Sequence, residues 1–180
     1  MEAMAGRGEV RLPIETERLI VRCFLPDADT KPMLRVYGDP EVMRFIPGGA
    51  VSSELAVRSL LQRYVELQER QGFSSWAVVE RESGIPVGDA GFGIFQPTGD
   101  VELGYTLARG RWGRGYATEA ARACLEAALE YLSAPRIIAV VDAENEASLR
   151  VPVRIGMQKV ETIRAHGRPH VLFAASRPAD

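Results

Sequence analysis

The chain has 180 residues, of which 46% are hydrophobic and 26% charged, so it can form one soluble domain with a substantial core. Its 22 basic and 24 acidic residues give a net charge of -2 without a long run of either sign, which argues against a nucleic-acid or membrane-surface binder. Cys23 and Cys124 lack metal-ligand spacing, and no apolar run suits a signal peptide or a membrane span. We therefore expect a cytoplasmic protein with no metal site and with neither nucleic acid nor membrane as a partner.

The chain is predicted to consist of a short lead-in and one domain. Residues 1–10 are expected to be a disordered lead-in, because the first residues are small, polar and glycine-containing. Residues 11–177 are expected to form a single domain, since no repeat, low-complexity tract or linker divides them.

The first quarter of the domain is predicted to hold one strand and two helices. Residues 19–25 are rich in strand-forming side chains, and this run stops at Pro26. A helix with an aspartate cap follows. A second helix, with apolar residues at helical spacing, opens at Ser52 or Ser53 and ends at Gly72.

Three strands and a long helix are predicted next. Residues 76–80 and 87–95 form the two arms of a hairpin around a Ser-Gly turn. Residues 101–107 alternate between an apolar face and a polar face, and Glu102 lies on the polar one. The helix, over residues 117–132, carries an apolar stripe in which Cys124 is a packed core thiol.

The last third is predicted to contain three strands and a short helix. Residues 137–141 read as a strand buried on both faces, and the helix spans about 148–155. Strands over 158–165 and 170–175 flank a turn at residues 167–169. The order β-α-α-β-β-β-α-β-α-β-β predicts one α/β domain built on a mixed sheet.

A loop rich in glycine and arginine joins strand 101–107 to helix 117–132. Unpaired amides and the positive end of the helix dipole make such a loop suitable for a phosphate or pyrophosphate. Gly113 and Gly115 allow the backbone to approach the anion closely. Three arginines are expected to supply charge for further phosphates: Arg109, Arg111 and Arg114. The alternative is a tight strand-to-helix turn without a ligand, and neither the P-loop nor the dinucleotide fingerprint fits.

The segment Trp112-Gly113-Arg114-Gly115-Tyr116-Ala117-Thr118-Glu119-Ala120 closely resembles the acyl-CoA loop of the GNAT superfamily of N-acetyltransferases. The superfamily pattern is Arg/Gln-x-x-Gly-x-Gly/Ala, in which Trp112 takes the first position, Gly115 the glycine and Ala117 the small residue. Tryptophan at this place is similar to the RimJ/RimL-type branch, whose members acetylate protein N-terminal amines and small amines.

Three further segments agree with the resemblance, which covers roughly residues 14 to 175. They are Thr16-Glu17-Arg18-Leu19, Glu102-Leu103-Gly104-Tyr105, and Asn145-Glu146-Ala147-Ser148 followed by Gly156-Met157. The resemblance implies a single-domain GNAT-like mixed β-sheet flanked by helices. It also implies acetyl-CoA as co-substrate, and it allows for a homodimer, which is common in the family.

The resemblance implies which residues bind acetyl-CoA. The pantetheine arm would pair with strand backbone at Leu107 and Ala108, and Asn145 would hydrogen-bond the arm near the thioester. The loop residues expected to hold the rest of the cofactor are Trp112, Gly113, Arg114, Gly115, Tyr116, Ala117 and Thr118.

Two residues are candidates for the acid-base chemistry of acetyl transfer. Glu102 is the candidate base, direct or through water, and the alternative is a solvated or salt-bridged strand glutamate. Ser148 is the candidate proton donor by its family position, and the alternative is a helix N-cap. Pro152 stands where many superfamily members have a proton-donating tyrosine. Because proline fits poorly inside a helix, it predicts a short or kinked last helix.

We therefore expect an acetyl-CoA-dependent N-acetyltransferase that acetylates a primary amine, either a protein N-terminus or a small molecule, by direct attack in a ternary complex. The altered last helix leaves one alternative open, a non-catalytic acyl-CoA-binding sensor or structural domain of the same fold. A module that interacts with partners without CoA is a more distant third.

Overall fold

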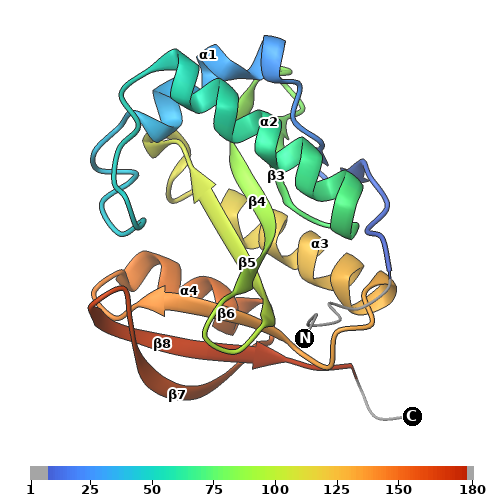
Figure 1. Cartoon of the computed structure of the whole chain (residues 1–180), viewed down its shortest axis with the longest axis vertical. Coiled ribbons are helices and arrows are strands. Elements are labelled where there is room, and N and C mark those ends of the chain that lie inside the picture. The colour runs from blue at the N-terminus through green and yellow to red at the C-terminus, as the bar shows by residue number, and fades with distance from the viewer. Residues whose placement is uncertain (1–7, 178–180) are drawn as a thin grey trace.

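A computed structural model of the chain describes residues 8–177. It contains an eight-stranded sheet in the order β1-β2-β3-β4-β5-β6-β8-β7, with four helices packed on it (Figure 1). The strands are β1 (Ile14–Glu15), β2 (Leu19–Arg22), β3 (Ser75–Glu80), β4 (Pro86–Phe95), β5 (Asp100–Leu107), β6 (Ile137–Asp142), β7 (Gln158–Ala165) and β8 (Arg168–Ala175). The helices are α1 (Pro26–Tyr37), α2 (Glu54–Gln71), α3 (Tyr116–Tyr131) and α4 (Glu146–Arg154).

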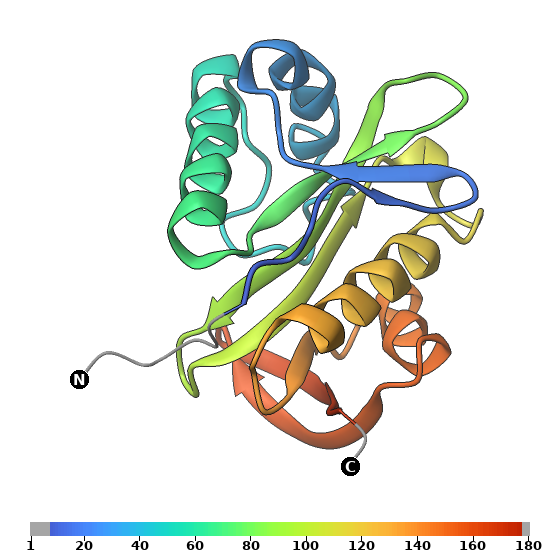
Figure 2. The same cartoon turned by 90° about the vertical axis from the view of Figure 1, so that its right-hand side faces the viewer.

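The helices cover the sheet on both faces. Figure 2 shows α1 and α2 on one side of the sheet and α3 and α4 on the other. The largest hydrophobic cluster, which includes Trp76 and Ala120, lies between the sheet and α3. A second cluster lies under α1 and α2, where Met33 and Leu61 pack against Ala77. Burial of both faces explains why the strands of the sheet centre carry so many apolar residues.

The predicted order of elements is confirmed, with the two-residue strand β1 as an addition. The predicted cap of α2 is also found, because the Ser53 hydroxyl accepts a hydrogen bond from the Ala56 amide. Gly72 ends the same helix in the left-handed conformation, at φ 81°. No helix of residues 8–177 is long and apolar enough to cross a membrane.

Three details differ from the prediction. The predicted aspartate cap of α1 is wrong, because the N-cap is Leu25 and no side chain caps it. The β7–β8 turn lies at His166 and Gly167, whose φ angles of 49° and 78° suit a two-residue hairpin, so Arg168 and Pro169 belong to β8 rather than to the turn. Of the predicted lead-in, residues 1–7 lie outside the described residues. Val10 is only 1% exposed and its amide donates to the Gly72 carbonyl at 2.9 Å, so the ordered chain begins before residue 11.

The central pair of strands positions the site. β5 and β6 are parallel and pair only at Val101–Ile137 and Glu102–Ile138. Beyond Glu102 the two strands separate, while each continues to pair with its other neighbour, β4 or β8. The sheet therefore opens into a V at the carboxyl ends of two central strands, where ligands of α/β folds commonly bind.

Two glycines of β4 differ in the space around them, and this difference gives a prediction for stability. A Cβ atom at Gly88 would lie 2.0 Å from the Thr106 carbonyl oxygen, whereas one at Gly93 would meet no atom within 4 Å. We expect Gly88→Ala to lower the free energy of unfolding by about 1–3 kcal/mol, because the β4–β5 pair has to shift. The matched variant Gly93→Ala should stay within about 1 kcal/mol of the wild type. Urea unfolding measures both, and equal losses would contradict the packing described.

Candidate functional site

The V between β5 and β6 opens into a cavity of about 620 Å³. Its walls come from the segment after α1, the end of β5, the loop before α3 with the first turn of that helix, and the start of α4. Nine of the predicted site residues line it: Leu107, Trp112, Gly113, Gly115, Tyr116, Ala117, Thr118, Asn145 and Ser148. Residues predicted from three separate segments therefore meet in one place.

Three predicted residues do not line the cavity. Ala108 packs against the cluster under α1 and α2, and its amide donates to the Val87 carbonyl at 2.8 Å. Arg114 is exposed. Glu102 lies at the point of the V, as the last residue of β5 that pairs with β6.

Four backbone amides at the start of α3 are available to a ligand. The helix has Gly115 as its N-cap, at φ 80°, and no side chain caps it. Its first hydrogen bond runs from the Glu119 amide to the Gly115 carbonyl, at 3.0 Å. Among the described residues, the amides of Gly115, Tyr116, Ala117 and Thr118 thus have no acceptor. This end of the helix has the properties of an anion site.

Glu80, at the end of β3, holds both ends of the loop before α3. Its carboxylate accepts two hydrogen bonds from the Arg111 guanidinium, each 2.8 Å long, and one from the Tyr116 hydroxyl at 2.9 Å. The hydrogen bonds from Arg111 lower the pKa of Glu80 to about 2, against the opposing effect of burial. Arg111 is therefore paired within the protein, and Arg109 lies 3.1 Å from Asp39, instead of both being free for a phosphate as predicted.

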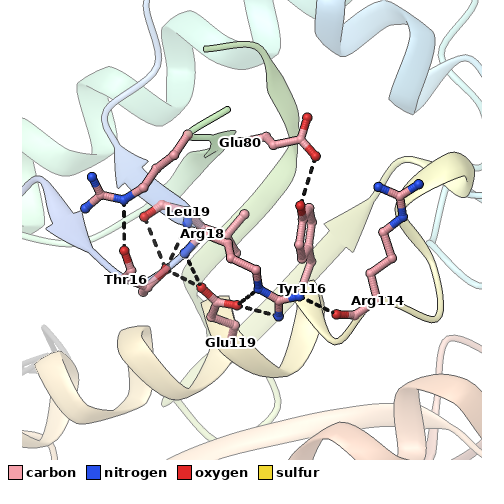
Figure 3. A network of polar contacts seen from close by, with 8 residues as sticks. Thr16, Arg18, Leu19, Glu80, Arg114, Tyr116 and Glu119 are labelled. Atoms are coloured by element: carbon pink, nitrogen blue, oxygen red, sulfur yellow. Dashed lines mark hydrogen bonds and ion pairs between the residues drawn. The ribbon is translucent and has the colours of Figure 1, made fainter. Parts of the chain in front are cut away.

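Glu119, in the first turn of α3, is held by the turn between β1 and β2 (Figure 3). Its carboxylate accepts from the Thr16 hydroxyl at 2.6 Å, from the Arg18 amide at 2.9 Å and from Arg18 Nε at 2.7 Å. Arg18 Nη1 also donates to the Arg114 carbonyl at 2.9 Å. Burial would raise the pKa of Glu119, but the bonds from Thr16 and Arg18 outweigh it and lower that pKa.

The start of α4 differs from the prediction. The helix begins at Glu146, and Asn145 is its cap, because the Asn145 side-chain oxygen accepts from the Ser148 amide at 3.2 Å. Ser148 is thus the third residue of the helix, and the alternative that it is the N-cap is wrong. The Tyr105 hydroxyl of β5 donates to the Ser148 carbonyl at 3.0 Å and so joins the two walls of the V. Pro152 is buried in this helix of nine residues, which is short as predicted.

Glu102 has no ion-pair or hydrogen-bond partner among the described residues. It points to the face opposite Tyr105, and on that face Gly93 stands directly across from it and Gly104 two residues further along β5. Both glycines are exposed, and a Cβ atom at either would meet nothing within 4 Å. Burial raises the pKa of the Glu102 carboxyl to about 7. Of the two alternatives, the salt-bridged strand glutamate is wrong, because Glu102 has no ion-pair partner among residues 8–177; the solvated one stays a prediction.

Cys124 and three large aromatic residues near the site are core residues. Cys124 is fully buried in the stripe of α3, as predicted. Phe73 and Trp76 are at most 1% exposed and pack around Phe92, so they do not line the cavity. Tyr37 is buried as well, and its hydroxyl donates to Asp89.

Comparison with known proteins identifies the class. The sequence matches the Acetyltransferase (GNAT) domain family over residues 18–158, which is most of the chain. It is 31% identical over 161 residues to the uncharacterized protein YkkB of Bacillus subtilis, a match that covers 88% of this chain and 92% of that protein. The chain therefore belongs to the GNAT acetyltransferase family, and the predicted superfamily is confirmed.

Solved structures agree with this assignment. An acetyltransferase of the GNAT family from Bacillus anthracis has a TM-score of 0.77 at 26% identity, over 92% of this chain and 98% of that one. RimL, a ribosomal L7/L12 alpha-N-protein acetyltransferase in complex with coenzyme A, has a TM-score of 0.78 over 94% of this chain and 100% of that one. At 16% identity, the second likeness concerns the fold alone.

The Glu80 network gives a prediction for stability. Glu80→Gln should lower the free energy of unfolding at neutral pH by about 1–3 kcal/mol, because Arg111 loses its charged acceptor. The pKa of Glu80 is about 2 in the folded state, against an ordinary value of 4.5 for the unfolded chain. The difference in unfolding free energy between wild type and variant should therefore shrink as the pH falls from about 4.5 to about 2. Urea unfolding of both proteins across this range measures it. The neighbouring exposed Glu82→Gln is the control, and a pH-independent difference would refute the assignment.

Proposed function

We propose that the protein transfers an acetyl group from acetyl-CoA to a primary amine, within the RimJ/RimL-like branch of its family. The observation that carries the proposal is the cavity at the V, with four available amides at one end and Ser148 in its wall. Its volume of about 620 Å³ lies in the range of small-molecule sites. Acetyl transfer by direct attack needs donor and acceptor side by side, and a V open to both faces of a sheet permits this.

The donor would bind along the loop and the edge of β5. The amides of Gly115, Tyr116, Ala117 and Thr118 supply donors for the diphosphate, and the helix dipole supplies positive potential. The pantetheine arm would follow the backbone of β5 to Leu107, on the side that β6 leaves unpaired; the Ala108 amide, also predicted to take part, is already bonded to the Val87 carbonyl. The cap uses the Asn145 oxygen, so its NH₂ group is left to donate to a carbonyl of the arm.

The chemistry needs a base and an acid. The amine nitrogen attacks the thioester carbonyl carbon, the C–N bond forms, and the C–S bond breaks with the electron pair leaving on sulfur. Glu102 would accept the proton of the amine, directly or through water, and a pKa of about 7 suits this role at neutral pH. Ser148 would donate a proton to the departing thiolate. Proline at position 152 cannot, because it carries no side-chain proton donor.

The acceptor would approach Glu102 across an uncovered part of the sheet. One hydrophobic cluster of this face lies under α1 and α2, and another surrounds Ile138. Figure 1 shows β4 and β5 passing between these two parts of the molecule. Gly93 of β4 and Gly104 of β5 are exposed and leave bare backbone beside Glu102. Glycine inside a strand costs stability, and close approach of a ligand is a reason to keep it. A protein N-terminus or a small amine would fit this description.

Binding of the donor gives a prediction for thermal unfolding. Acetyl-CoA at a hundredfold its dissociation constant should stabilise the native state by roughly 2.7 kcal/mol. This corresponds to a rise in Tm of about 2–4 °C for a domain of this size. Thermal unfolding with millimolar acetyl-CoA measures it, and ATP at equal concentration tests for unspecific anion binding. Equal shifts, or none, would overturn the proposal.

Loss of the base gives a prediction for turnover. Glu102→Gln should lower kcat/KM by roughly 10²–10⁴ while the Kd for acetyl-CoA is unchanged. A base must be deprotonated to act, so below a pH of about 7 wild-type kcat/KM should gain a factor of ten per pH unit from the titration of Glu102. The variant should lack this factor and keep only the pH dependence that comes from the amine. Thiol release in an amine screen measures both, with the exposed Glu126→Gln as control. Unchanged turnover would exclude Glu102, and donor binding by a wild type that acetylates no amine would indicate the non-catalytic sensor.

A further inference from the structure

The turn between β1 and β2 lies against the outer side of the loop before α3. It touches that loop through one side chain, Arg18, which also bonds Glu119. We propose that Arg18 is a positioning residue for the donor, which orients the Gly115 amide toward the diphosphate and neutralises Glu119 beside it. This inference rests on the proposed function, because it concerns affinity for a donor that carries a diphosphate.

The first argument is the orientation of a peptide plane. In a trans peptide the C=O group and the following N–H group point in opposite directions. Arg18 Nη1 holds the Arg114 carbonyl at 2.9 Å, so the N–H of Gly115 in the same plane points away from Arg18. Gly115 lines the cavity on its other side. Arg18 thereby directs a ligand-binding amide without touching the ligand.

The second argument is electrostatic. Glu119 lies in the first turn of α3, close to the amides that would bind the diphosphate, and its carboxylate would repel that anion. The pair with Arg18, at 2.6 Å, and the bond from Thr16 turn the carboxylate toward the β1–β2 turn and cancel its charge. The Glu119 side chain is 17% exposed, so solvent screens this charge only partly.

The third argument is that Arg18 and Glu80 hold the start of α3 from the outer side of the loop. The Arg18 guanidinium lies over the Tyr116 ring, 4.8 Å from its centroid, and the Tyr116 hydroxyl bonds Glu80. Figure 3 shows Arg18 between Glu119 and Arg114, with Tyr116 beside it. Arg18 comes from the β1–β2 turn and Glu80 from β3, and neither lines the cavity, so neither would have to be displaced by the donor.

Arg81 provides a matched control. It is also an arginine bound to the β1–β2 turn, because its Nε donates to the Thr16 carbonyl at 2.9 Å and its Nη2 to Glu15 at 2.6 Å. Its side chain is 38% exposed, against 42% for Arg18. No contact joins Arg81 to the loop among the described residues. Arg81→Ala therefore removes an equal charge from beside the same turn without releasing the loop.

The experiment compares two donors in three proteins. Arg18→Ala should raise the Kd for acetyl-CoA by roughly tenfold, from the lost orientation and the uncovered Glu119 charge. Arg81→Ala should bind acetyl-CoA as the wild type does. S-acetylpantetheine lacks the diphosphate, so its kcat/KM should be unchanged within about twofold in both variants. Titration calorimetry and thiol release measure these quantities.

If Arg18 had a merely structural role, Arg18→Ala would impair the use of both donors alike, and that outcome would overturn the inference. Equal acetyl-CoA affinities of Arg18→Ala and Arg81→Ala would overturn it as well. If Arg18→Ala does not fold, Arg18→Lys decides, because one ammonium cannot bond the Arg114 carbonyl and chelate Glu119 as a guanidinium does. It should then show a smaller loss confined to acetyl-CoA. A wild type that binds no acetyl-CoA would instead refute the proposed function.

Discussion

The separation of β5 from β6 is the constraint on which the rest of the site depends. Two parallel strands pair at Glu102 and its neighbour Val101 and then diverge, which leaves strand backbone without a partner in the middle of a sheet. Buried backbone groups need hydrogen bonds, so such a gap is costly unless the protein bridges it or a ligand fills it. Here Tyr105 bridges it on one face by bonding Ser148, and the cavity occupies what remains. The glutamate at the point of the V and the loop at its open end are consequences of this one geometry.

The loop before α3 has to keep its amides free and yet hold its shape. Polar groups that bonded the amides would block an anion site, so the contacts that fix the loop have to use its other groups. Glu80 and Arg18 supply such contacts by bonding side chains and one carbonyl of the loop while leaving the amides alone. Glycine as the N-cap completes this arrangement, because Ser or Asp at Gly115 would cap the helix with its own side chain. The protein thus stabilises the loop with ion pairs that a ligand does not displace.

Much of the site could be predicted, because its residues are close in sequence. The loop from Trp112 to Thr118 is one continuous segment, and nearly all of it lines the cavity. Prediction was poorer where a role depends on distant partners. Arg111 looked like a phosphate ligand and proved to be paired with Glu80, 31 residues earlier. The cap of α4 proved to be Asn145 rather than Ser148, since a boundary shift of two residues is within the uncertainty of any periodicity argument.

The sequence by itself determined the family, the order of the elements and the glycine-rich loop, because these depend on local composition and on spacing along the chain. Only the tertiary structure decided what Glu102, Arg18 and Glu80 can do. Nothing local distinguishes a strand glutamate with a raised pKa from one with a lowered pKa. Glu102 faces bare backbone without a partner, and Glu80 faces an arginine, and these surroundings are set by strands and turns that meet only when the sheet has formed. Electrostatic roles depend on distances in space, which the order of residues does not contain.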